Sequence, residues 1–131
     1  MLETLALIEN KLATLTAFSK RVHHKPVSTK KPMWEVRYNG ARRDARGYRH
    51  SWEVWIWASL YHDPRAQTRN RQRTEQVVIA LIEVAEETGC IILRDIEADV
   101  AIPDETDVRN VNKPLAFAIS TILVEESDSR G

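Results

Sequence analysis

The sequence predicts an α+β fold in which two helices pack on one face of a mostly antiparallel, four- to five-stranded sheet with a long β-hairpin. Two stretches, residues 2–18 and 63–88, repeat apolar residues at helical spacing. Three others, residues 34–38, 48–61 and 91–102, alternate as strands do. We expect one domain over residues 1–131, because two cores in a chain of 131 residues would each lack apolar surface.

The first helix is predicted over residues 2–18, and a polar loop at 28–32 should separate it from the first clear strand, residues 34–38. The apolar face of this helix consists of Leu5, Ile8, Leu12 and Leu15. Asn39-Gly40 follows the strand, and this pair favours the positive φ angles of a tight turn. Because several arginines prolong the connection, we expect a long, basic hairpin loop rather than a minimal turn. These arginines are Arg42, Arg43, Arg46 and, at the start of the next strand, Arg49.

The strand predicted at 48–61 has an almost continuous apolar row at its even positions. Its odd positions include Trp55 and Trp57, so one face should meet the helices and the other more protein or a partner. A second helix should begin with Asp63 as N-cap and Pro64 at its first position, with fraying before Thr74. Thr88-Gly89 is a typical helix end.

The last third of the chain predicts two more strands. In residues 91–102 an apolar row is expected to face the core, formed by Ile92, Ile96, Ala98, Val100 and Ile102. The acidic residues Asp95, Glu97 and Asp99 should share the opposite face. A loop at 103–113 precedes a central strand at 115–124, which is apolar on both faces, and residues 125–131 read as a flexible tail.

Charge is divided unevenly along the chain, although the net charge is zero. Residues 1–73 carry 15 Lys and Arg against 6 Asp and Glu, whereas residues 74–131 carry 4 against 13. This division suits either a nucleic acid bound by the basic part or copies of the chain that meet head to tail. No apolar run is long enough to cross a bilayer, and the single Cys90 is typical of a cytoplasmic protein.

The sequence contains no motif that predicts catalysis, a metal or another cofactor. The histidines and Cys90 lack paired metal-ligand spacing, and there is no glycine-rich phosphate loop or nucleophile motif. Asp95, Glu97 and Asp99 could form an acid–base pair or a cation site. Their alternation along a strand is explained more simply by the solvated face of a sheet. We therefore expect a protein that is not an enzyme, while a site assembled from dispersed residues stays open.

Two binding functions fit the remaining residues. The arginines at 42, 43, 46 and 49, together with those between Arg65 and Arg73, could hold phosphates while Trp55 and Trp57 stack on bases. Alternatively, the basic hairpin and the acidic strand could join copies of the chain, with the tryptophans as interface anchors. The candidate subunit-interface residues are Arg42, Arg43, Arg46, Arg49, Trp55, Trp57, Asp95, Glu97 and Asp99.

The order of elements resembles that of the tail terminator, or tail completion, proteins of long-tailed bacteriophages. The resemblance rests on the N-terminal helix and on an arginine-rich hairpin that enters Arg-His-Ser-Trp-Glu-Val-Trp-Ile-Trp, residues 49–57. It continues in the helix with Val-Val-Ile-Ala-Leu-Ile and in the closing strand Ala-Ile-Ser-Thr-Ile-Leu-Val-Glu-Glu. It spans nearly the whole chain as a pattern of elements and lengths.

This resemblance implies a structural role in assembling a virion. Subunits would form a ring, often a hexamer, that caps the tail tube and offers a surface to the head–tail connector. The partners would be other copies of the chain, the tail tube and the connector, with no membrane and no cofactor. The protein would act in the cytoplasm of the bacterial host during assembly and in the virion tail, and its gene could lie in a prophage.

Overall fold

The computed structural model describes residues 2–21, 31–45, 47–59, 65–101 and 117–127. Two helices and a five-stranded sheet follow one another as α1 (Leu2–Leu12), β1 (Ser19–Lys20), β2 (Met33–Asp44), β3 (Gly47–Ser59), α2 (Ala66–Thr88), β4 (Ile91–Ala101) and β5 (Phe117–Glu126). Within these described residues the strands lie in the order β1-β2-β3-β5-β4, and only the β1–β2 pair is parallel. The predicted α+β class, with a mostly antiparallel sheet and a long hairpin, is confirmed.

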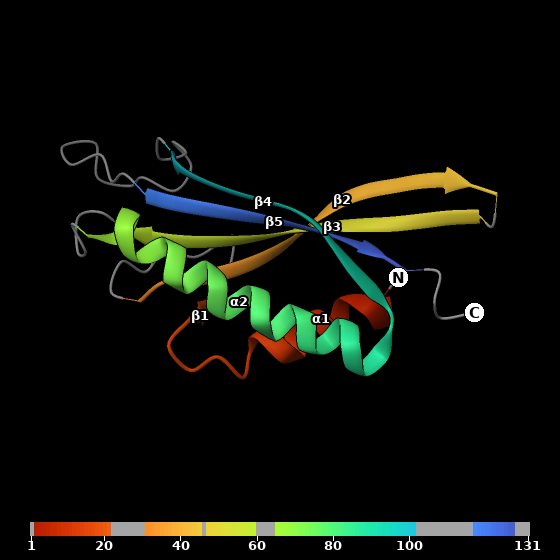
Figure 1. Ribbon diagram of the computed structural model, residues 1–131, viewed down its shortest axis with the longest axis horizontal. Coiled ribbons are helices and arrows are strands. Elements are labelled where there is room, and N and C mark those ends of the chain that lie inside the picture. Colours follow the sequence, from red (N-terminus) through yellow and green to blue (C-terminus); the bar gives the residue numbers. More distant parts are fainter. Residues whose placement is uncertain (1, 22–30, 46, 60–64, 102–116, 128–131) are drawn as a thin grey trace.

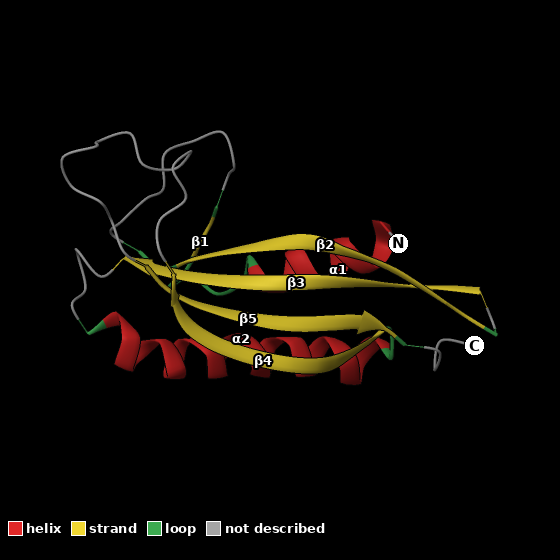
Figure 2. Ribbon diagram, turned by 90° about the horizontal axis from the view of Figure 1, so that it is seen from above, coloured by secondary structure: helices red, strands yellow, loops and turns green. Residues whose placement is uncertain are grey.

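One main core joins both helices to alternate residues of the sheet. Ile8 and Leu12 of α1 and Leu81 of α2 are fully buried in it. The strand residues of this core define what we call the core face of the sheet: Trp34, Trp52, Val54, Ile56, Ile122 and Val124. The alternate residues of the same strands form the outer face. Figure 2 looks onto the strands with the helices behind them.

The helices differ from their predicted bounds for local reasons. The α-helix ends at Leu12 rather than at residue 18, because the chain turns through Leu15 and places Phe18 in the core. The second helix begins at Ala66 after Arg65, and the predicted cap at Asp63-Pro64 lies outside the described residues. The predicted fraying before Thr74 is wrong, since Asn70 and Thr74 both hydrogen-bond to Ser120 of β5. Gly89 ends the helix with a left-handed conformation, as predicted.

Lys11 and Glu83 connect the two helices through an ion pair. The hydrogen bond to Glu83 raises the pKa of the Lys11 ammonium above its ordinary value. Because both side chains are partly exposed to water, this ion pair contributes less to the packing of α1 on α2 than their shared core does.

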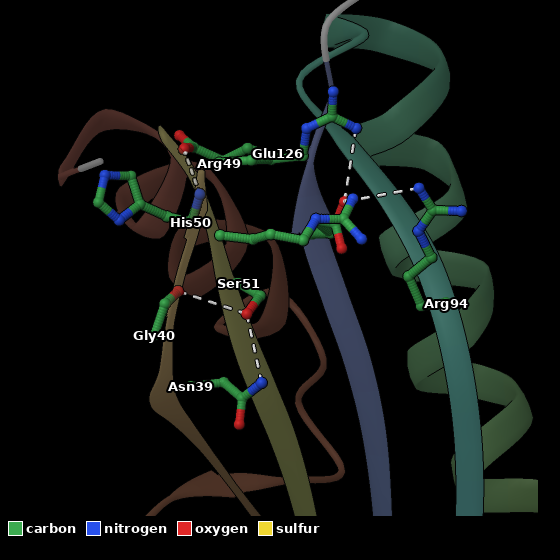
Figure 3. Close-up of polar contacts among 9 residues, drawn as sticks. Asn39, Gly40, Arg49, His50, Ser51, Arg94 and Glu126 are labelled. Carbon is green, nitrogen blue, oxygen red and sulfur yellow. Dashed lines mark hydrogen bonds and ion pairs between the residues drawn. The ribbon is translucent and has the colours of Figure 1, made fainter. Parts of the chain in front are cut away.

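Strands β2 and β3 pair with each other almost to the tip of the hairpin. The prediction of a long, basic hairpin loop is therefore wrong. Asn39-Gly40 is not the turn but a β-bulge, where the register shifts between Tyr38 and Gly40. Gly40 has φ of +120°, a conformation that other residues rarely adopt. The Ser51 hydroxyl donates to the Gly40 carbonyl and accepts from the Asn39 amide, which holds the bulge (Figure 3). The strands then continue together to Asp44 and Gly47.

A bulge at Arg94 changes which residues of β4 face the core. Leu93 stands opposite Val124, but after the bulge Asp95 stands opposite Leu123 and Ile96 opposite Ile122. Ile96 therefore shares the core-face row with Leu93, while Ile92 lies opposite Glu125 on the other row. The prediction that Ile92 and Ile96 share a face is wrong, because the extra residue shifts the alternation by one.

The predicted central strand is confirmed as β5, which lies between β3 and β4. It ends two residues later than predicted, however. Glu125 and Glu126 belong to the strand, and the Ser127 N–H donates to the Cys90 carbonyl. The prediction of a flexible tail from residue 125 is therefore wrong for residues 125–127, and residues 128–131 lie outside the described part. Most of the loop predicted at 28–32 and all of the loop predicted at 103–113 also lie outside the described residues.

Candidate interaction site on the hairpin arm and outer face

The tip of the hairpin extends beyond the rest of the sheet. β3 pairs with β5 only from Ser51 to Ser59, so residues 47–50 pair only with residues 41–44 of β2. We call these residues the arm. It projects from one end of the molecule in Figures 1 and 2. Tyr48 on the arm is 70% exposed, and Arg42 and Arg43 are exposed beside it.

Two consecutive glutamates at the end of β5 hold the root of the arm, one on each face of the sheet. The Glu126 carboxylate accepts a hydrogen bond from the His50 backbone N–H (Figure 3). It also accepts one from the Thr4 hydroxyl of α1. The Glu125 carboxylate on the outer face contacts three guanidinium groups. Together these contacts fix the direction in which the arm leaves the sheet.

The three arginines around Glu125 come from three strands. One oxygen, Oε1, lies 2.9 Å from the nearest nitrogen of Arg42, 3.4 Å from that of Arg49 and 3.5 Å from that of Arg94. We call these four residues the basic cluster. One carboxylate among three guanidiniums leaves an excess of positive charge at the root of the arm.

Removal of the Glu125 carboxylate should destabilise the arm. In Glu125→Ala, three arginines would lose their shared counter-charge, and Arg49 is largely buried. We expect a loss of about 1–3 kcal/mol in the free energy of unfolding, together with faster hydrogen exchange of the arm amides. Glu75→Ala on the exposed side of α2 is the control. Unchanged exchange in the arm would show that Glu125 does not hold it.

Farther along the outer face lies a second group, which we call the tryptophan cluster: Arg21, Glu35, Arg37, Trp55 and Trp57. The buried Glu35 Oε1 accepts from Arg21 at 3.0 Å, from Arg37 at 2.8 Å and from the Trp57 Nε1–H at 2.8 Å. The Trp55 and Trp57 rings stack at 5.6 Å. The Arg37 guanidinium lies 4.0 Å from the Trp55 ring centre. The Glu35 carboxylate thus finds its positive partners within the chain, whereas the buried Arg37 Nε and Trp55 Nε1 atoms have no hydrogen-bond partner among the described residues.

The structure separates the predicted site residues into groups. Arg42, Arg43 and Arg49 lie on the arm, and Arg46 lies outside the described residues. Trp57 is only 4% exposed and Trp55 is half-buried beneath Arg37, so neither tryptophan presents an open ring on this face. Their role as interface anchors stays a prediction. Asp95 is exposed and lines a 160 Å³ pocket of the outer face with Glu53 and Thr121. Glu97 and Asp99 occupy ladder positions opposite Thr121 and Ile119.

Sequence reasoning missed the acidic partners of these arginines. Glu125 and Glu126 were assigned to a tail, although the pair ends an apolar strand and so could have been expected to continue it. In the strand predicted at residues 34–38, Glu35 is one polar residue of the alternation, and nothing in the sequence marks it as buried. A lone acid among arginines on neighbouring strands is the signal for such clusters, but only the pairing of the strands identifies the neighbours.

Within the part of the chain that the structure describes, no three His, Cys, Asp or Glu side chains gather as a metal site would require. No described helix is both long and apolar enough to span a membrane. Comparison of the sequence with known protein families and with curated proteins found no match to either. The site must therefore be interpreted from its own geometry.

Proposed function

We propose that the protein is a structural subunit of a bacteriophage or prophage tail, similar to tail terminators. Copies assemble into a ring that caps the tail tube and joins it to the head–tail connector. It works by binding other protein chains rather than by catalysis, in the bacterial cytoplasm during assembly and then in the virion. The observation that carries the proposal is the projecting arm.

The arm has the properties of an element that needs a partner. A two-stranded ribbon without further packing is at best marginally stable in water. Here the two strands of the ribbon pair as far as Asp44 and Gly47. The large exposed side chains of the ribbon are tyrosine and arginine, residue types that are enriched at protein interfaces. Its root is held by Glu125 and Glu126. The arm is held in one direction and exposes an aromatic side chain near its tip. These properties fit a contact with another protein chain better than a loop that only meets solvent.

The nucleic-acid alternative is less well supported by the same face. Stacking on bases needs free aromatic rings. Trp57 is buried, and its Nε1–H donates to Glu35, while Arg37 lies over the Trp55 ring. The two rings also stack on each other. The tryptophans therefore stabilise this chain, and the exposed arginines alone favour no nucleic acid over an acidic protein surface.

The first experiment is the solution mass of the purified protein by light scattering across a wide range of concentration. We expect a discrete ring-sized species that forms without nucleic acid. The measurement is repeated with a single-stranded and a duplex oligonucleotide. A monomer that binds oligonucleotide tightly at physiological salt would replace the proposal with the nucleic-acid alternative.

Replacement of the arm's exposed tyrosine tests the role of the arm. We expect Tyr48→Ser to weaken ring formation by roughly tenfold or more, since an interface aromatic contributes about 2 kcal/mol. Its thermal stability should match that of the parent, because Tyr48 packs little within the chain. Ile79→Ser, at an exposed position of α2, is the matched control and should assemble normally. Equal assembly by both variants would exclude the arm tip from the interface.

A further inference from the structure

The two edges of the sheet differ in charge. β4 pairs with β5 on one side only, and β2 pairs with β1 only at Met33 and Trp34. Among the described residues, no strand pairs with the side of β4 that faces away from β5, or with the side of β2 that faces away from β3 between Val36 and Asp44. A long unpaired edge is a template for a strand of another chain unless the protein covers it or charges it. These two edges are charged, with opposite sign.

The edge at β4 is acidic. Asp95 is exposed on the outer-face row of the strand. Glu97 and Asp99 follow at alternate ladder positions, so the three acids belong to one row. The stretch from Asp95 to Ala101 contains no lysine, arginine or proline.

The edge at β2 is basic where it forms the arm. Arg42 lies on the outer-face row, as its contact with Glu125 shows, and Arg43 follows it. Tyr38 stands opposite the core residue Trp52, yet 53% of it is exposed. The β2 edge thus has Arg42 on the outer-face row, whereas its core-face row has the exposed Tyr38 ring next to the arm and Arg43 on the arm itself.

We infer that the arm of one copy adds its β2 edge to the β4 edge of a second copy, so that the sheet continues from subunit to subunit. The inference rests on the proposed ring and identifies the contact that builds it. Strand addition of this kind takes its affinity from backbone hydrogen bonds and its specificity from the side chains of each row.

Charge decides which edges can meet. Two β4 edges would bring rows of carboxylates together, and two arms would bring arginines together, and both arrangements are repulsive. Only the unlike pair is attractive. A contact between two different patches is heterologous, and it generates a ring when the rotation closes.

The side chains of the β2 edge complement those of the β4 edge on both faces of the sheet. When the outer faces of both copies are aligned, Arg42 meets the row of Asp95. On the other side, Tyr38 meets the row of Ile96, which is 51% exposed although its ladder partner Ile122 is fully buried. Charge therefore pairs with opposite charge on one face, and aromatic with aliphatic surface on the other.

A charge exchange between the two edges tests this contact. We expect Asp95→Arg and Arg42→Glu each to weaken assembly by roughly tenfold, because each places like charges across the edge. An equimolar mixture of the two variants should regain the mass of the parent assembly, since every contact then joins opposite charges. The readout is light scattering of each variant and of the mixture.

The control is Glu53→Arg, which reverses a charge on the same outer face but on the interior strand β3. It should assemble like the parent. Thermal unfolding of each variant checks the fold, and recovery in the mixture excludes misfolding as the cause of a loss. If the parent forms a ring and neither edge variant weakens it, or the mixture does not recover, this contact is wrong while the ring stands. A parent that stays monomeric at every concentration overturns both the contact and the proposed function.

Discussion

Replacing Glu35 by alanine is expected to lower the free energy of unfolding by about 3–5 kcal/mol. The Glu35 carboxylate is 3% exposed and accepts hydrogen bonds from Arg21, Arg37 and Trp57. The Arg21 side chain is equally buried. Without the carboxylate, a buried guanidinium loses its counter-charge and an indole N–H loses its acceptor. Urea unfolding of the parent and the variant measures the difference.

Two variants make this experiment specific. Glu35→Gln keeps an oxygen acceptor for Trp57 but removes the charge, so it should lose less than the alanine variant. Glu53→Ala removes a carboxylate from the neighbouring strand, where no buried cluster depends on it, and should change stability by less than about 0.5 kcal/mol. If Glu35→Ala lost no more than Glu53→Ala, the tryptophan cluster would not be a centre of stability.

Trp52→Ala is expected to have a similarly large effect, about 3–5 kcal/mol. Trp52 is among the largest fully buried side chains, and it packs in the main core at the point where the arm leaves the body of the sheet. Its ring also contacts Tyr38 and His50. The cavity would therefore reduce global stability and loosen the root of the arm. Chemical unfolding and hydrogen exchange of the arm amides measure the two effects separately.

The matched control is Tyr38→Ala, at the position opposite Trp52 in the β2–β3 ladder. Tyr38 is an aromatic residue of the same hairpin, but it is largely exposed and should contribute only about 1 kcal/mol through its ring contacts. A result in which both variants lose the same stability would mean that burial at Trp52 does not hold the hairpin.

The arm was predictable in outline, because alternation on both sides of the arginines already indicated a long hairpin. Its ladder was not. Asn39-Gly40 is a strong turn signal by itself, yet here the pair forms a bulge, since the strands gain more by pairing on to Asp44 and Gly47 than by turning early. The bulge at Arg94 could not be predicted from the sequence either. A single extra residue leaves no mark on composition but moves every later side chain to the other face.

Local periodicity determined the class of this protein, the order of its two helices and four long strands, and the acidic and basic segments, because spacing and alternation depend on neighbours in the chain. It did not indicate the two-residue strand β1. Only the tertiary structure decided which charges meet. Glu35 with Arg21, and Glu125 with Arg42, Arg49 and Arg94, are brought together by the sheet order β1-β2-β3-β5-β4. That order sets which residues become cross-strand neighbours, and it places the basic arm and the acidic strand at opposite edges, a relation between residues distant in sequence that no local pattern contains.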